Sequence, residues 1–303
     1  MSLTIVPFAE GEARLGWIGL TDASAAGHAL PKAEIADTFL YRGKDTLLNR
    51  AAWIDGLGLA VKSATIFPGN AATSDPTVNG GVTLYRDSDG ALEALVDFHL
   101  VTKWKTAGDS LLAARKLARE DSRNILIIGA GTVARSLVQA YSAAFPEASF
   151  TVWNRTHANA LAFAASIPGM AVAENLEHAV KAADIITSAT MTTEPNLKGE
   201  GLQAGQHVDL IGAYRPDMRE VDDEALRRSR IFVDSFDTTV GHIGELKIPL
   251  AASVISRGDL VADYYDLSRF FRTADSDITL FKNGGGAHLD LMTARYILDR
   301  FRG

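Results

Sequence analysis

The spacing of hydrophobic residues changes partway along the chain. Before residue 119, short runs such as 81–85 and 91–98 read as strands, and the turn signal Asp87-Ser-Asp-Gly90 separates them. Such runs are typical of antiparallel strands joined in hairpins. From residue 124 on, continuous apolar runs alternate with helical patterns, as in a parallel sheet covered by helices. The sequence therefore predicts an α+β first part and an α/β second part.

Two domains are expected at this length. The charged stretch 119–123 is the predicted boundary, and the spacing of Thr106 and Asp109 predicts a capping box and thus a helix that begins at Thr106. Segment 286–301 has helical spacing and could return to the first domain. We therefore assign residues 1–118 with 287–303 to the first domain and 119–286 to the second. The second domain is predicted to hold strands at 124–128, 149–153, 170–173, 184–190, 207–212 and 231–234.

The composition excludes several kinds of chemistry. The 303 residues include no cysteine, which excludes disulfides, thiol nucleophiles and cysteine-ligated metals. The seven histidines show no ligand spacing, so no metal site is expected. A net charge of −7 argues against a general nucleic-acid binder. Because neither a secretory signal nor an apolar run long enough to span a bilayer is visible, we expect a cytoplasmic protein without a membrane partner.

A glycine-rich loop follows the apolar run 124–128. Gly129-Ala130-Gly131-Thr132-Val133-Ala134 has the G-x-G-x-x-A spacing and leads into a predicted helix at 135–144. In this context the first glycine permits a tight turn, the second lets the backbone approach a pyrophosphate, and the alanine allows close helix packing. The loop therefore predicts a dinucleotide site formed by Gly129, Ala130, Gly131, Thr132 and Val133.

The end of the next predicted strand indicates which dinucleotide binds. NAD sites usually place a carboxylate about 20 residues after the glycine loop, to bind the ribose diol. Here the residues are Asn154, Arg155 and Thr156. A guanidinium is suited to a 2′-phosphate, and the two neutral side chains can add hydrogen bonds. We therefore expect NADP(H) to be favoured over NAD(H), unless Arg155 is only a solvated surface residue.

Several further motifs resemble those of the ornithine cyclodeaminase/μ-crystallin family, and together they span nearly the whole chain. They are Gly58-Leu-Ala-Val-Lys62-Ser, Phe67-Pro-Gly-Asn70, Lys105-Thr106-Ala-Gly, the Gly129 loop, the run from Ile211 to Glu220, Val233-Asp-Ser235 and Gly244-Glu245-Leu. The resemblance implies a Rossmann domain, a substrate and dimerisation domain built from both chain ends, and a homodimer. It also implies that Ala189, Thr190, Gly212 and Asn283 line the cofactor site, although the glycines around Asn283 could instead form a bare hinge.

The resemblance further implies how a substrate carboxylate is held. Arg42, Lys62 and Lys105 correspond to the basic residues of the family, and Asn70 and Thr77 could line the same site. Strand alternation leaves Lys62 free to point either inward or toward solvent. Lys105 keeps the charge of the family's arginine and loses its bidentate fork. If the helix begins at Thr106, Lys105 lies beside a helix N-terminus, where a cation is unfavourable unless an anion is also present.

One departure from the family pattern bears on the reaction. Cyclodeaminases carry an aspartate where this chain has Tyr214, and a phenol is a poor base at neutral pH. Together with the expected NADP(H) site, this favours reduction of a small cyclic imine that bears a carboxylate, such as Δ1-pyrroline-2-carboxylate or Δ1-piperideine-2-carboxylate. The proton donor is left open between Lys62 and a bound water. Asp217, Arg219 and Glu220 are interpreted as a structural, salt-linked loop.

Two other hypotheses remain. A cyclodeaminase of ornithine or lysine, or an alanine dehydrogenase, would be a different enzyme of the same family. A protein that binds NADPH and a small ligand without turnover would belong to another functional class.

Overall fold

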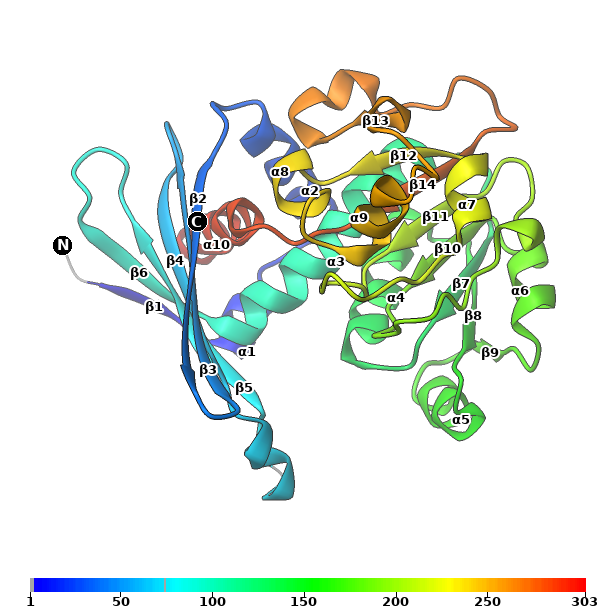
Figure 1. Cartoon of the computed structure of the whole chain (residues 1–303). Helices are drawn as coiled ribbons and strands as arrows, with labels where there is room; N and C mark the ends of the chain where they lie inside the picture. Colours follow the sequence, from blue (N-terminus) through cyan, green and yellow to red (C-terminus); the bar gives the residue numbers. More distant parts are fainter. Residues whose placement is uncertain (1–2, 74) are drawn as a thin grey trace. The chain divides into compact units, whose positions relative to one another are not determined.

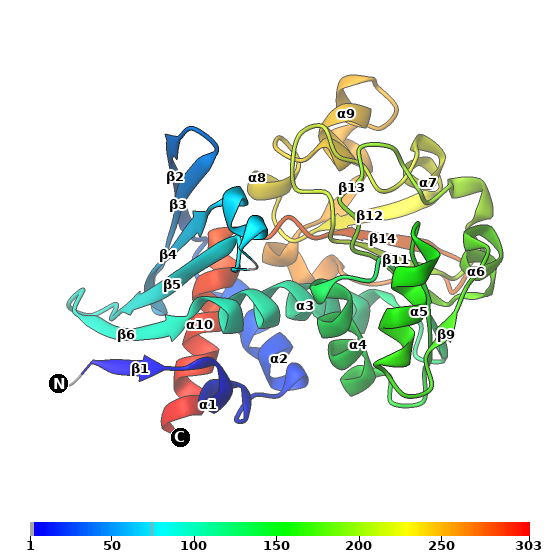
Figure 2. The same ribbon diagram turned by 90° about the horizontal axis from the view of Figure 1, so that it is seen from below.

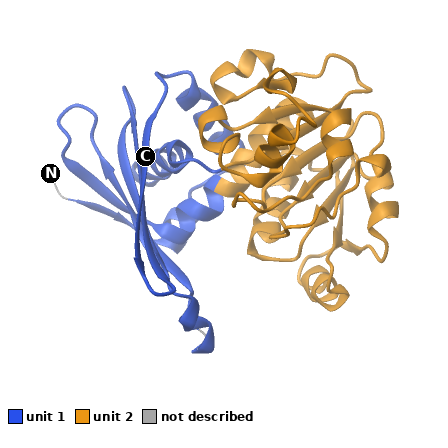
Figure 3. Cartoon of the chain, in the orientation of Figure 1, with its two compact units in different colours: residues 1–105, 285–303 blue, residues 106–284 orange. Residues whose placement is uncertain are grey.

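The chain forms two compact units, which comprise residues 1–105 with 285–303 and residues 106–284 (Figure 3). The computed structural model describes residues 3–73 and 75–303. Figures 1 and 2 show the elements of both units with their labels. Each unit has its own sheet.

The first unit contains a six-stranded sheet in the order β1-β6-β5-β4-β3-β2. Only β1 and β6 pair in parallel, and every other pair is antiparallel. The strands are β1 Thr4–Val6, β2 Glu34–Arg42, β3 Asp45–Ile54, β4 Gly58–Ile66, β5 Val78–Tyr85 and β6 Leu92–Asp97. The expected hairpin of β5 and β6 is confirmed, whereas β2 and β3 were not predicted.

Helix α10, Ala287–Arg302, packs across this sheet, as Figure 1 shows, and helices α1 Phe8–Glu12 and α2 Trp17–His28 pack against α10. On β4 the even positions Ala60, Lys62 and Ala64 are buried, whereas the odd positions between them are half-buried. This period of two is expected of a strand with one face covered. The last predicted helix is therefore confirmed, and it contacts the even face of β4.

The second unit contains an eight-stranded parallel sheet in the order β13-β12-β14-β11-β10-β7-β8-β9. Its strands are β7 Asn124–Ile128, β8 Ser149–Trp153, β9 Ala171–Val172, β10 Ile185–Ser188, β11 His207–Leu210, β12 Ser229–Val233, β13 Leu260–Ala262 and β14 Ile278–Lys282. The strand order reverses beside β7, as in dinucleotide-binding sheets. The predicted Rossmann architecture is confirmed, while β13 and β14 were not predicted.

The helices of the second unit flank its sheet (Figure 2). They are α4 Thr132–Ala144, α5 His157–Ala165, α6 Leu176–Ala182, α7 Asp223–Arg228, α8 Phe236–Thr239 and α9 Gly244–Ala251. Short 3₁₀ turns occur at η1 Pro68–Ala72 in the first unit and at η2 Gly199–Gly201, η3 Arg257–Asp259 and η4 Tyr264–Arg269 in the second. The sheet and helices enclose an apolar core that includes Leu126, Ile186, Val208 and Leu280. Within the described ranges, no helix is both long and apolar enough to span a membrane.

Helix α3, Phe98–Leu117, corrects one prediction. It begins eight residues before Thr106, and the carboxylate of Asp97 accepts a 2.8 Å hydrogen bond from the backbone N–H of Leu100. Thr106 therefore lies inside the helix, the predicted capping box is wrong, and Lys105 does not stand at a helix N-terminus. Buried side chains occur on both sides of Thr106, from Leu100 to Leu117, so one helix runs through.

The first compact unit ends at Lys105 within α3, earlier than the predicted boundary at 118/119, and it resumes at Gly285 rather than at residue 287. The second half of α3 is fastened inside the second unit. The hydroxyl of Tyr264 donates to the carbonyl of Asp109 at 2.6 Å, and Arg272 donates to the carbonyl of Leu117. The charged stretch at 119–123 is a local feature of the chain and does not separate the units.

Candidate functional site

The predicted cofactor residues of the second unit converge where its parallel strands end. Gly129 follows β7 with a φ of +111°, and a Cβ there would lie 2.9 Å from the carbonyl oxygen of Ala189. A Cβ at Gly212, after β11, would lie 2.2 Å from the carbonyl oxygen of Thr190. Only glycine allows both approaches. The structure thus brings Gly129, Ala189, Thr190 and Gly212 together at one edge of the sheet.

Helix α4 begins at this edge. Gly131 is its extended N-cap residue, and Gly131 and Thr132 are exposed, so the first backbone N–H groups can be approached from solvent. Ala134 is fully buried, which is the close helix packing that the glycine loop predicts. A helix N-terminus with accessible N–H groups favours an anion such as a pyrophosphate. The chain's own residues therefore fit a dinucleotide here.

Glu220 organises two of these loops. Its Oε1 accepts hydrogen bonds from the Ser188 hydroxyl at 2.6 Å and the Thr190 N–H at 2.9 Å. Its Oε2 accepts from the N–H groups of Gly212 at 2.6 Å and Ala213 at 3.0 Å. The side chain is fully buried. The interpretation of Glu220 as part of a salt-linked loop is corrected, because its carboxylate binds backbone N–H groups of both loops.

Glu245 in turn holds Glu220. Its carboxylate accepts from the N–H groups of Glu220 at 2.7 Å and Val221 at 3.1 Å. Burial, together with the nearby charge of Glu220, raises the pKa of Glu245 to about 7. The expected salt links do occur at the neighbouring residues, where Arg215 pairs with Asp217 at 2.9 Å and Arg219 with Asp223 at 2.8 Å.

The expected 2′-phosphate residues lie at the end of β8. Arg155 and Thr156 are exposed, and the amide of Asn154 donates to the carbonyl of Thr156 at 2.9 Å. Asn283 follows β14, and its backbone N–H donates to the carbonyl of Leu210 at the end of β11, at 3.0 Å. Its amide donates to the Thr106 carbonyl and the Ser110 hydroxyl, both at 3.1 Å, so that its NH₂ group is directed at α3.

Lys62 forms the centre of a second group of residues, in the first unit. Its Nζ lies 2.9 Å from the carboxylate of Asp290 on α10 and 4.8 Å from the centre of the Phe98 ring. Lys62 is 6% exposed and Asp290 is 1% exposed. The orientation of Lys62, which the sequence left open, is therefore inward.

The ionisation of this pair reflects its surroundings. Burial lowers the pKa of Lys62, and the charge of Lys105 lowers it further, against the opposing effect of Asp290. Burial alone would raise the pKa of Asp290, but the charges of Lys62, Lys105 and Arg50 outweigh it and lower that pKa. A buried ammonium whose proton is more weakly held is a candidate acid for chemistry near neutral pH.

Two more cations accompany the pair. Arg50 on β3 stands directly opposite Lys62 in the strand register, and its Nη1 donates to the carbonyl of Gly285 at 2.7 Å. The Nζ of Lys105 approaches the same carbonyl at 3.5 Å. On its other side, Arg50 binds the carboxylate of Asp37 at 3.0 Å. We call Asp37, Arg50, Lys62, Lys105 and Asp290 the Lys62 cluster.

Arg42 is not brought into the Lys62 cluster. It lies at the end of β2, its side chain is 80% exposed, and it pairs with Asp45 at 2.9 Å. Asn70 and Thr77 lie in the loop between β4 and β5, where the Asn70 amide donates to the Pro76 carbonyl at 2.9 Å and the Thr77 carbonyl accepts from Phe67 N–H at 2.8 Å. The two residues share a loop, and their roles stay predictions.

Three members of the cluster, Asp37, Arg50 and Asp290, were not predicted from the sequence, and two of them had a local signal. Asp290 interrupts the apolar run Leu289, Leu291 and Met292, which was a signal of a buried carboxylate in need of a partner. Arg50 lies on the same face of β3 as the buried Ala52 and Ile54. This alternation indicates that the Arg50 side chain points toward the protein interior. The partner of Arg50 follows from the strand register, and the partner of Asp290 follows only from the placement of α10 on the sheet.

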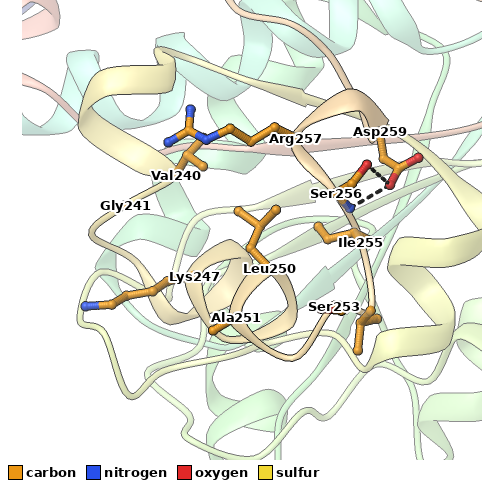
Figure 4. A pocket seen from close by; sticks show the side chains of 11 residues that line it. Val240, Gly241, Lys247, Leu250, Ala251, Ser253, Ile255, Ser256, Arg257 and Asp259 are labelled. Atoms are coloured by element: carbon orange, nitrogen blue, oxygen red, sulfur yellow. Dashed lines mark hydrogen bonds between the residues drawn. The ribbon is translucent and has the colours of Figure 1, made fainter.

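A separate hollow of about 740 Å³ lies beside α8, α9 and η3 and is lined by Lys247, Leu250, Ser253 and Arg257, among others (Figure 4). It contains none of the predicted site residues. Asp259 there accepts hydrogen bonds from the N–H and hydroxyl of Ser256, at 2.7 and 2.9 Å, as the dashed lines in the figure show. The hollow is open, and its charged side chains do not converge on one point.

The chain is similar to several known proteins along most of its length. The model of the ornithine cyclodeaminase/mu-crystallin family matches residues 54–303. Delta(1)-pyrroline-2-carboxylate reductase of Paracoccus denitrificans (strain Pd 1222) is 47% identical over 298 residues, which cover 96% of this chain and 94% of that protein.

Two solved structures resemble the whole chain. Thermococcus litoralis Delta(1)-pyrroline-2-carboxylate reductase, in complex with NADH and L-proline, has a TM-score of 0.89 at 26% identity and covers 98% of this chain and 97% of its own. An archaeal alanine dehydrogenase dimer with bound NAD has a TM-score of 0.89 at 25% identity and covers 99% and 96%.

Replacement of Glu220 tests the organisation of the cofactor edge. Glu220→Gln puts an NH₂ donor where the carboxylate accepts from backbone N–H groups of both loops. We expect a loss of about 1–3 kcal/mol in unfolding free energy, measured by urea denaturation, and weaker NADPH binding, measured by fluorescence titration. Asp217→Asn, which removes an exposed ion pair, is the control and should change neither quantity appreciably. Unchanged NADPH affinity in Glu220→Gln would contradict this assignment.

Replacement of Asp290 tests the buried pair. Asp290→Leu leaves the Lys62 ammonium buried without its carboxylate, and the expected cost is about 3–5 kcal/mol of unfolding free energy at neutral pH. The double variant Lys62→Met/Asp290→Leu removes both charges and should recover most of that loss. Urea denaturation of the single and double variants measures the difference. A double variant no more stable than Asp290→Leu would show that the two charges are not energetically coupled.

Proposed function

Because the chain belongs to the ornithine cyclodeaminase/mu-crystallin family, we propose that it reduces a small cyclic imino acid to the cyclic amino acid with a nicotinamide cofactor. The substrate is Δ1-pyrroline-2-carboxylate or Δ1-piperideine-2-carboxylate. The observation that carries this proposal is the buried Lys62–Asp290 pair with Lys105 beside it, because it offers both a carboxylate site and an acid. The names of the Paracoccus denitrificans and Thermococcus litoralis relatives support the same reaction.

The cofactor is held by the second unit. The glycine loop from Gly129 to Val133 would hold the pyrophosphate through backbone N–H groups at the start of α4, and the loops around Thr190 and Gly212 would complete the cofactor site. When bound, the reduced cofactor supplies the hydride. The exposed Arg155 binds a 2′-phosphate, so NADP(H) is preferred over NAD(H). Asn283 helps to shape this site.

Lys62 and Lys105 have different roles toward the substrate. Lys105 attracts the carboxylate, while Lys62 donates a proton from Nζ to the imine nitrogen. Burial favours this transfer because it lowers the pKa of Lys62. Asp290 fixes the ammonium in place through the 2.9 Å contact. Hydride addition to the C=N carbon and proton addition to the nitrogen together yield the neutral amine.

Tyr214 argues against a cyclodeaminase. It stands where that activity uses an aspartate, and it is 58% exposed with its ring near the guanidinium of Arg215. A phenol holds its proton at neutral pH and is therefore a poor base there. Reduction therefore suits this chain better than deamination.

The protein is proposed to act as a homodimer. Phe39, Leu40 and Tyr41 on β2 are 48%, 60% and 73% exposed, and exposed apolar patches often mark interfaces. The archaeal relative is described as a dimer. A cytoplasmic location stays a prediction from the sequence.

A steady-state assay tests the reaction. Wild-type protein mixed with NADPH and Δ1-pyrroline-2-carboxylate should consume the reduced cofactor, followed by its absorbance. Lys62→Met should lower the rate by about 100-fold or more, since a positioned acid contributes that much. The control Lys247→Met lies in the separate hollow of Figure 4 and should keep the wild-type rate. No consumption by wild type with either imine would reject the reductase, leaving another activity of the family or ligand binding without turnover.

Charge reversal at Arg155 tests the cofactor preference. Arg155→Asp places a carboxylate where the 2′-phosphate is proposed to bind, so NADPH affinity should fall at least about tenfold while NADH affinity stays similar or rises. Fluorescence titration with both reduced cofactors measures this, with Arg227→Asp on α7 as the surface control. Equal losses for both cofactors in Arg155→Asp would mean that the arginine does not read the phosphate.

A further inference from the structure

Arg50 belongs to the face of the first sheet that α10 covers. In the β3–β4 register Arg50 stands opposite Lys62, and directly opposed residues of antiparallel strands project to the same face. The neighbours of Arg50 on that face, Ala52 and Ile54, are 4% and 0% exposed. Arg50 keeps a quarter of its side chain exposed. It is therefore anchored in the cluster and still within reach of a small ligand.

The guanidinium is held in one orientation. Its Nε and Nη2 donate to the carboxylate of Asp37, with distances of 3.0–3.2 Å, and its Nη1 donates to the carbonyl of Gly285 at 2.7 Å. Asp37 stands opposite Arg50 on β2, so the pairing follows from the strand register. With Asp37 on the Nε–Nη2 edge, a ligand carboxylate would meet this fixed guanidinium at its Nη1–Nη2 end.

The charges of the Lys62 cluster do not cancel. Lys62, Arg50 and Lys105 are cations, and Asp37 and Asp290 are carboxylates, so the five side chains carry one net positive charge. The field of Arg50 acts on both Lys62 and Asp290. A ligand with a single carboxylate would bring the net charge of this partly buried cluster to zero.

We propose that Arg50 is the arginine that binds the substrate carboxylate, in the role that the sequence led us to expect for Arg42. This inference rests on the proposed function and names its specificity-determining residue. Asp37 acts as a positioning residue through Arg50. Arg42, exposed and paired with Asp45 at the end of β2, has no part in it.

Two substrates distinguish a loss of carboxylate recognition from a general loss of enzyme activity. Δ1-Pyrroline has the ring imine without the carboxylate of Δ1-pyrroline-2-carboxylate. In Arg50→Met, KM for the carboxylated imine should rise roughly 30-fold or more, since an aligned charged contact is lost. The kcat/KM for Δ1-pyrroline should stay within about threefold of wild type. Arg50→Lys should recover part of the loss because it keeps the charge without the fork.

Two matched variants complete the experiment. Arg42→Met should leave both substrates unaffected, and Asp37→Asn should raise KM for the carboxylated imine less than Arg50→Met does. Equal losses on the two imines in Arg50→Met would show a structural role and overturn the proposal, as would an unchanged KM or a larger effect from Arg42→Met.

Calorimetric titration with L-proline, in the presence of NADP⁺, gives an independent readout. Proline affinity should fall in Arg50→Met and stay unchanged in Arg42→Met. If wild type binds proline but reduces neither imine, the proposed function fails while the titration still decides the role of Arg50. Equal proline affinity in wild type and Arg50→Met, or no binding to wild type, overturns the role of Arg50.

Discussion

The chemistry proposed for this protein depends on one buried ion pair, Lys62 with Asp290. The strand supplies the ammonium and helix α10 supplies the carboxylate, and the two meet at 2.9 Å with almost no exposure to solvent. Taking both charges out of water costs more than their attraction returns in many proteins. The pair is therefore better explained by a functional role than by a contribution to folding stability, because nonpolar side chains would fill the same space at a lower cost in free energy. What it provides is an ammonium in a fixed place with a lowered pKa.

The second unit uses buried carboxylates in a different way. Glu220 has its partners among backbone N–H groups, and it draws together the loops after β10 and β11. Gly212 permits the close approach, since a side chain there would collide with the Thr190 carbonyl. The shape of the cofactor edge is thus determined by a glycine and a glutamate that need not touch the cofactor. Buried charge determines loop geometry in this unit, whereas in the first unit it is proposed to recognise a ligand.

The sequence predicts those parts of the molecule whose structure is determined by residues close together along the chain. The glycine loop at Gly129 follows a buried strand and opens a helix, and each of these signals lies within a few residues of the next. The start of α3 shows the limit of such reasoning. Thr106 and Asp109 have a capping spacing, but the buried positions on both sides of them extend one helix through that point, and packing prevails over a weak local signal.

Arg42 and Arg50 show what local reasoning cannot decide. Both are arginines of the same hairpin, and only the strand register tells which one faces Lys62. The long separation between Lys62 and Asp290 likewise hides their pairing until the helix is placed on the sheet. Glu220 was recognised as structural from its motif, but its partners depend on loops that follow other strands.

In the proposed reaction, the net charge of the Lys62 cluster connects substrate binding with proton transfer. Burial and the nearby cations lower the pKa of Lys62 and so favour release of its proton. A bound carboxylate adds a negative charge beside those cations, and an opposite charge raises the pKa of an ammonium. The acid is therefore more fully protonated when the substrate is present. As the imine nitrogen takes the proton, the neutral Lys62 left behind is the form that burial prefers, which lowers the cost of the transfer in this environment. The bound carboxylate thus favours the protonated form of Lys62, whereas burial favours the neutral form that proton transfer leaves behind. A substrate without the carboxylate would gain only the effect of burial.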